Sequence, residues 1–177
     1  MNTGQTMLTI GSMMLLTFLV LRFNSIQLTT AETAYNAKFG IVAISLANSL
    51  IEEAKDKVFD EVVLDTTKTI YNATDFSSVL RSESGEVYPN FDDFDDYNGP
   101  TGEGFFYLDT LSLRNPQTGV YTRFEIRSNV EYVSDTNPNV KSSINTYHKK
   151  LNVSVFSDAM IDTVKISTVF SYWTLLE

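Results

Sequence analysis

Residues 7–21 read MLTIGSMMLLTFLVL, a stretch with the length and composition of a membrane-type helix. No charged side chain occurs before Arg22, so the uncharged run extends from Met1 to Leu21. A helix of that length measures about 31 Å, close to the hydrocarbon core of a bilayer at about 30 Å. We therefore predict a helix that lipid or other subunits cover. Because no basic residue precedes the run, unlike in a secretory signal, we expect the segment to be retained.

The helical pattern continues beyond the apolar run. Apolar residues recur at three- and four-residue spacing, with polar and charged residues between them. They are Ala37, Ile41, Ile44, Ala47, Ile51, Ala54 and Val58. This spacing places them on one face of an amphipathic helix. We predict one helix of about 50–60 residues, well above the usual length, with a hydrophobic part at residues 1–30 and an amphipathic part at 31–61.

The remaining residues, 62–177, predict a globular head. Alternating apolar and polar residues, which mark half-buried strands, occur within Val120–Val133, Leu151–Val155 and Val164–Ser171. Phe105–Leu113 is a further candidate strand. Antiparallel strands of this kind leave one face free to pack on the amphipathic helix. The expected fold class is α+β, with a long N-terminal α-helix packed on a small antiparallel sheet at residues 105–173.

An acidic loop, predicted at residues 82–113, precedes most of these strands. It contains no Lys or Arg, and its Gly and Pro residues are typical of a loop. Its acidic residues are Glu83, Glu86, Asp92, Asp93, Asp95, Asp96, Glu103 and Asp109. Carboxylates suit calcium, so Asp92, Asp93, Asp95 and Asp96 are candidates for binding a cation or a neighbouring subunit. The run does not fit the EF-hand template, and we expect a solvated loop rather than a metal site.

Composition excludes several classes of protein. The chain has no Cys, which excludes disulfides, thiolate zinc sites and cysteine nucleophiles. Its single histidine, His148, excludes a histidine-rich metal site. A net charge of −9 argues against general nucleic-acid binding, which needs clustered Lys and Arg. We expect no catalytic residue and no cofactor, with calcium as the one candidate ligand.

The layout of a long N-terminal helix, an acidic loop and a closing sheet resembles the type IV pilins and pilin-like proteins, including minor pilins and secretion pseudopilins. The segments that carry the resemblance are Gly4–Ile10, Gly11–Leu21, the helix to about Glu61, the aspartate-rich stretch Asp92–Gly99, and the hairpin of Lys150–Val155 with Val164–Trp173. The resemblance implies a structural subunit, not an enzyme, of an extracellular or envelope-spanning filament. The specific role, whether adhesion, motility or secretion, stays open.

The resemblance also implies how the filament is built. The apolar helix is inserted in the inner membrane before assembly, and the pilus assembly machinery then exchanges its lipid contacts for contacts with equivalent helices of other copies. The finished filament lies at the cell surface. The residues that this picture places in the filament core are Gln5, Met7, Leu8, Thr9, Ile10, Gly11, Met14, Leu15, Phe18 and Leu19.

One position departs from the family pattern. Pilins typically carry a glutamate at the fifth mature position, which neutralises a neighbour's α-amino group in the apolar core. That position is Gln5 if Met1 is the mature start, or Thr9 if cleavage follows Gly4. Either residue offers only neutral hydrogen bonds, and we expect residues 1–4 to be retained. The alternative function is a single-pass, membrane-anchored surface protein whose acidic loop binds a ligand or calcium.

Overall fold

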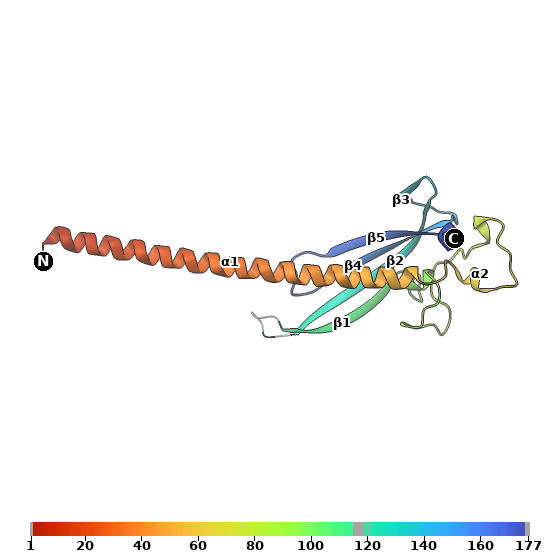
Figure 1. The fold of residues 1–177 in the computed structure, drawn as a ribbon, viewed down its shortest axis with the longest axis horizontal. Helices are drawn as coiled ribbons and strands as arrows, with labels where there is room; N and C mark the ends of the chain where they lie inside the picture. Colours follow the sequence, from red (N-terminus) through yellow and green to blue (C-terminus); the bar gives the residue numbers. More distant parts are fainter. Residues whose placement is uncertain (1, 115–118, 120, 176–177) are drawn as a thin grey trace. The chain divides into compact units, whose positions relative to one another are not determined.

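The computed structural model describes residues 2–114, 119 and 121–175 (Figure 1). The fold is α+β, as the sequence predicts, with one long N-terminal helix and an antiparallel sheet. The helix, α1, comprises Thr3–Lys55. The chain forms two compact units that divide within α1, Met1–Phe39 and Gly40–Glu177, and each is described by itself.

The second unit contains all the elements that follow α1. They are α2 (Glu61–Leu64), the 3₁₀ helices η1 (Ala73–Asp75) and η2 (Asp95–Asn98), the strands β1 (Phe105–Arg114), β2 (Tyr121–Ser134), β3 (Asn137–Lys141), β4 (His148–Phe156) and β5 (Val164–Ser171), and the 3₁₀ helix η3 (Tyr172–Leu175). The main sheet has the order β1-β2-β4-β5, and each neighbouring pair is antiparallel. The short strand β3 pairs with the end of β2.

The strands confirm the alternation seen in the sequence. In β2, Phe124, Ile126, Ser128 and Val130 are buried, and in β4 Leu151 and Val153 are buried, while the residues that alternate with them are more exposed. The candidate strand at residues 105–113 is confirmed as β1. The predicted boundary of the acidic loop at residue 113 is therefore wrong, and the loop ends at Gly104.

The part of α1 that lies in the second unit runs along the sheet (Figure 1). Its buried residues are Ala43, Ala47, Leu50, Ile51 and Ala54. Their spacing of three, four or one residues defines one helix face. The three alanines on this face have short side chains, which allow the helix backbone to lie close to the neighbouring residues.

Two details of the predicted helix are wrong. Ile41 and Ile44 are 70% and 45% exposed, because the buried face is centred on Ala43 and Ala47 rather than on these isoleucines. The helix also ends at Lys55 and not at Glu61. Beyond it, Val58 forms a parallel bridge with Asp93, which breaks the helix and brings Phe59 into the core.

Candidate functional site

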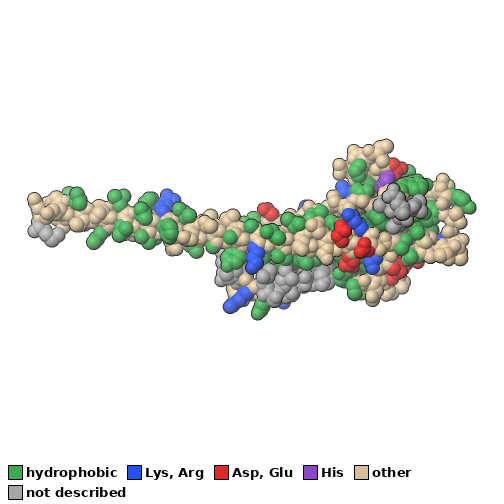
Figure 2. Space-filling view, viewed as in Figure 1, with side chains coloured by type: hydrophobic (Ala, Val, Ile, Leu, Met, Phe, Trp, Pro, Cys, Tyr) green, Lys and Arg blue, Asp and Glu red, His purple; other side chains and the backbone are tan. Residues whose placement is uncertain are grey.

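The first candidate site is the surface of α1 within the first unit. This helix is long and apolar enough to cross a membrane, and none of its most apolar window is buried in the structure. Figure 2 shows hydrophobic side chains along both edges and on the visible face of the N-terminal part of the chain. Fourteen of them are between 53% and 75% exposed: Met7, Leu8, Ile10, Met13, Met14, Leu15, Leu16, Phe18, Leu19, Val20, Leu21, Phe23, Ile26 and Leu28.

Several Ser and Thr hydroxyl groups of this helix donate hydrogen bonds to its own backbone. Thr9 Oγ1 donates to the carbonyl oxygens of Gln5 and Thr6, at 3.1 and 2.9 Å. Ser12 and Thr17 donate in the same way to carbonyl oxygens three or four residues earlier. A hydroxyl bonded to its own helix carries a smaller desolvation penalty into an apolar environment. The polar residues of the segment are therefore compatible with a lipid or helix-packed surrounding.

All ten residues predicted for a filament core lie on this helix, and all ten are exposed in the described structure. Gln5 and Thr9, the two alternatives that the resemblance gives for the glutamate position, are among them. The structure thus leaves the whole predicted set available for contact with lipid or with other subunits.

The second candidate site lies in the acidic segment of the head. The expectation of a solvated loop is wrong here, because Asp93, Asp95 and Asp96 have no exposed surface. Only Asp92 is exposed among the four aspartates predicted as a cation or subunit contact. The reason is the bridge between Val58 and Asp93, together with the aromatic residues Phe94 and Tyr97, which are fully buried and carry the intervening aspartates inward.

Two of these aspartates are held in place by backbone amides. Asp93 Oδ1 accepts hydrogen bonds from the N–H groups of Asp95 and Asp96, at 2.8 and 3.1 Å. Asp96 Oδ2 in turn accepts from the N–H groups of Asp92 and Asp93, at 2.9 and 3.1 Å. The second oxygen of each carboxylate is buried and accepts no hydrogen bond within the described residues. Each aspartate therefore has one fixed oxygen and one free oxygen.

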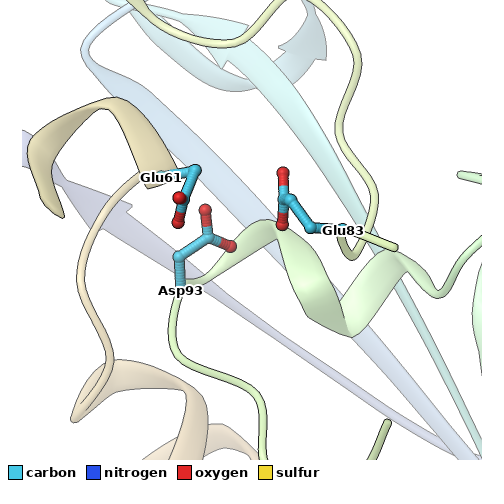
Figure 3. Close-up of side chains that lie close together, drawn as sticks. All are labelled: Glu61, Glu83 and Asp93. Atoms are coloured by element: carbon cyan, nitrogen blue, oxygen red, sulfur yellow. The ribbon is translucent and has the colours of Figure 1, made fainter. Parts of the chain in front are cut away.

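Three glutamates complete what we call the acidic cluster: Glu61, Glu83, Glu86, Asp93 and Asp96. Carboxylate oxygens of Glu61, Glu83 and Asp93 lie within 4.8 Å of one another, and so do those of Glu83, Glu86 and Asp96. Figure 3 shows the first group, with Glu61 at the start of α2 and its carboxylate facing that of Asp93. Glu83 belongs to both groups, so the five carboxylates form one continuous cluster.

Beside the cluster lies a buried ion-pair group made of Asp60, Asp95 and Lys149. Lys149 is fully buried and its Nζ donates to Asp60 Oδ2 at 2.8 Å, to the carbonyl oxygen of Phe59 at 2.7 Å, and to Asp95 Oδ1. Asp60 is further bonded to the backbone N–H groups of Val62 and Ser77. The hydrogen bonds of Asp60 fix the start of α2 and hence the position of Glu61.

Burial and neighbouring negative charge raise the pKa of several of these groups. Burial is the main cause of the raised pKa of Asp93, which is about 8, and the charge of Asp95 adds to it. Burial likewise raises the pKa of Asp96 to about 7, with a contribution from Asp93. The pKa of Glu83, although this residue is largely exposed, is raised to about 8 by partial desolvation and by a hydrogen bond with Glu86. The cluster therefore holds protons at a pH where isolated carboxylates are ionised.

Residues on the other side of the segment fasten it to the head. Asn98 donates from Nδ2 to the carbonyl oxygens of Leu80 and Gly102, both at 2.9 Å. Its Oδ1 accepts from Asn129 Nδ2 at 2.9 Å and from the N–H of Val130 at 3.1 Å. The last two bonds join the acidic segment to β2, and the first two tie it to the neighbouring loops, so that together they position the aspartates that precede Asn98.

Sequence reasoning missed Glu61, Glu83, Glu86 and Asp60 as site residues, and it predicted Lys149 as a partner of the acidic loop only from a neighbouring subunit, whereas Lys149 pairs with Asp60 and Asp95 of its own chain. The sequence does contain one indication that Lys149 is buried. Alternate residues of a strand face the same side, so Lys149 lies on the same buried face of β4 as Leu151 and Val153. A buried lysine requires carboxylate partners. Glu83 and Glu86 belong to the predicted acidic loop, but nothing in the sequence distinguished them from its other carboxylates, and Glu61 lies outside that loop.

Comparisons with known proteins leave the family undetermined. The chain matches no protein-family model, no curated protein and no solved structure. The pilin-like resemblance therefore rests on the layout of helix, loop and sheet.

Proposed function

We propose that the chain is a structural subunit of a pilin-like filament, inserted in a membrane through α1 before assembly and packed against copies of itself afterwards. The observation that supports this most directly is the exposed apolar surface of residues 7–28. Burial of one large apolar side chain contributes about 1.5–3 kcal/mol of favourable free energy, which is lost when the side chain stays in water. Fourteen such side chains outweigh the stability of a whole domain, about 5–15 kcal/mol, so this helix requires a cover.

The length of α1 favours a filament over a simple anchor. The helix has 53 residues, which corresponds to about 80 Å. A bilayer core accommodates only about 30 Å of it. The exposed residues that remain include Thr29, Thr30 and Thr33, which have low helix propensity, and an isolated helix of this kind is marginal in water. Equivalent helices of neighbouring subunits would stabilise this stretch, whereas a single membrane anchor offers it no partner.

The alternative is the single-pass, membrane-anchored surface protein. It accounts for the apolar run equally well, and the acidic cluster would then serve a binding role at the surface. The two functions differ in one measurable property, since only the filament subunit self-associates through the apolar helix.

A substitution at Gly11 tests the proposed function. A Cβ at this position would meet no atom within 4 Å, so a larger side chain fits the free subunit. Helices that pack in an apolar environment approach most closely at small residues. We expect Gly11→Leu to remove filaments from sheared cell material examined by electron microscopy while the chain stays in the membrane fraction.

Gly11→Ala is the matched control, and we expect it to retain most filaments because it adds a single methyl group. Normal filaments from Gly11→Leu would show that helices do not pack closely at this residue. Detergent-dependent monomers from the unaltered chain, without filaments, would contradict the proposed function and favour the membrane-anchored surface protein.

A further inference from the structure

The acidic cluster contains buried oxygens that lack partners. Within the described part of the chain, six buried side-chain oxygen or nitrogen atoms make no hydrogen bond, and four of them are carboxylate oxygens. Three of them belong to Glu61, Asp93 and Asp96 of the acidic cluster, and the fourth belongs to Asp95 of the neighbouring ion-pair group. A fifth is the hydroxyl of Ser82, which precedes Glu83. Buried polar atoms in native proteins are normally hydrogen-bonded. A concentration of unbonded carboxylate oxygens therefore indicates a cation that these oxygens can coordinate.

The free oxygens are held in fixed positions. Asp93 and Asp96 each have one oxygen bonded to two backbone N–H groups, which leaves the other oxygen directed away from them. Glu61 is placed by the hydrogen bond between Asp60 and the backbone of Val62 at the start of α2. A site whose ligands are already oriented loses little conformational entropy when an ion binds.

The spacing of the oxygens fits a single large cation. Calcium binds oxygens at about 2.3–2.6 Å, so two ligands on opposite sides of the ion lie about 5 Å apart. The ligand atoms of Glu61, Glu83 and Asp93, and those of Glu83, Glu86 and Asp96, all lie within 4.8 Å of one another. The oxygens of either group can therefore surround one ion.

The negative charge of the buried carboxylates is only partly offset by nearby cations. The buried aspartates Asp60, Asp93, Asp95 and Asp96 face one buried cation, Lys149, within the described residues. Lys149 is engaged by Asp60 and Asp95, so Asp93 and Asp96 have no cationic partner at hydrogen-bond distance among those residues. Either protons or a metal ion must offset their charge.

We propose that the acidic cluster binds calcium, with Glu83 as the ligand shared by its two groups of oxygens. This proposal is independent of filament assembly. Calcium accepts six to eight oxygens in irregular geometry, which suits carboxylates from three separate segments, whereas magnesium demands a smaller octahedral set. Glu83 is exposed and lines a surface hollow with Arg81, Ser82 and Glu86, so the ligand shared by the two groups is open to solvent.

A bound ion would tie together the start of α2, the loop at residues 83–86 and the turn at residues 93–96. The test uses the full chain in detergent, first treated with a chelator. We then add CaCl₂ or MgCl₂ at about 1 mM, near the range where extracellular calcium modules bind. Thermal unfolding and calorimetric titration report binding, and trypsin cleavage after the exposed Arg81 reports loop order.

We expect calcium to raise the melting temperature and slow cleavage at Arg81, and magnesium to do so much less. Glu83→Gln is expected to weaken calcium binding about tenfold or more, because it alters both oxygen groups. Asp96→Asn, which keeps its acceptor oxygen, provides a second variant. Glu103→Gln is the matched control, since Glu103 is an exposed carboxylate outside the cluster.

Three results would overturn the proposal. The first is an unaltered chain whose melting temperature calcium leaves unchanged. The second is Glu83→Gln and Asp96→Asn variants that bind calcium as tightly as the Glu103→Gln control. The third is an equal response to magnesium and calcium, which would contradict the choice of ion.

Discussion

Lys149 is a fully buried lysine on a strand whose other inward-facing residues are aliphatic. Its ammonium group has three oxygen partners, and its Nζ lies 4.6 Å from the ring centroid of Phe59 and 5.5 Å from that of Tyr132. The residue therefore joins Asp60, at the end of the segment after α1, to Asp95 in η2. It is the residue on which the geometry of the acidic segment depends.

We predict that Lys149→Met destabilises the head by about 3–5 kcal/mol, because it leaves Asp60 and Asp95 buried without their cation. The free energy of unfolding, from urea denaturation of the full chain in detergent, measures this. Lys150→Met is the matched control, since Lys150 is only half-buried, and we expect a change within about 0.5 kcal/mol. Equal stability of the two variants would show that the buried ion-pair group does not hold the segment.

The raised carboxylate pKa values predict a dependence of stability on pH. The folded pKa of Asp93 is about 8 and that of Asp96 about 7, whereas the unfolded values are about 4. The folded state thus binds more protons between these values. The contribution of these two carboxylates to the free energy of unfolding is complete below about pH 4. It declines as the pH rises through their folded pKa values.

Most groups that face these carboxylates also raise their pKa values, and the others only partly offset the rise. Asp93 faces Asp60 and Asp95, which raise its pKa, and Lys149, which lowers it, while Asp96 faces Glu86 and Asp93, which raise its pKa. In chelator, we expect the free energy of unfolding to fall between about pH 5 and pH 8. Asp93→Asn should flatten this slope, and a parent chain as stable at the upper as at the lower pH would contradict the prediction.

At the scale of elements, η2 and the loop after it are fastened to β2 mainly through Asn98. The buried amide donates two hydrogen bonds to carbonyl oxygens and accepts two from the neighbourhood of β2. Gly104, which follows this loop, has a φ of 121°, and a Cβ there would lie 2.9 Å from the carbonyl oxygen of Ser128. The loop is thus seated closely on β2 from both sides.

We predict that Asn98→Asp lowers the free energy of unfolding by about 1–3 kcal/mol, because a carboxylate oxygen would replace the NH₂ donor that faces two carbonyl oxygens. Urea denaturation of the full chain measures the change. Asn137→Asp is the control, since Asn137 is exposed and its acceptor oxygen is retained. A similar loss in both variants would mean that added negative charge, and not the buried amide, causes the effect.

The elements differ in how well their sequences predict them. The long helix and the strands β2, β4 and β5 follow from periodicity, since 3.6- and two-residue patterns record which side chains face the core. The end of α1 does not, because Val58 pairs with Asp93, a residue more than thirty positions away. The buried face of α1 also differs from the predicted one, because it depends on residues distant in sequence. Packing in the folded head, and not the helix sequence alone, decides that Ala43 is buried and Ile41 is exposed.

At the scale of the whole molecule, sequence reasoning predicted the fold class but only part of the candidate site. The aspartates were singled out by composition, yet their burial depends on contacts of Phe94 and Tyr97 with distant residues. The glutamates of the acidic cluster come from segments that only the folded chain brings together. The exposed helix was predicted in full, because an uncharged run of this length can be interpreted without tertiary structure.

Under the proposed function, the chain assembles with copies of itself through the exposed apolar helix. Electron microscopy with helical reconstruction of material sheared from cells that produce the unaltered chain tests this claim most directly. We expect filaments in which the apolar part of α1 packs against equivalent helices at the core, with the acidic heads outside. A chain found only as detergent-solubilised monomers from the membrane, with no filament that contains it, would contradict the proposed function as a filament subunit.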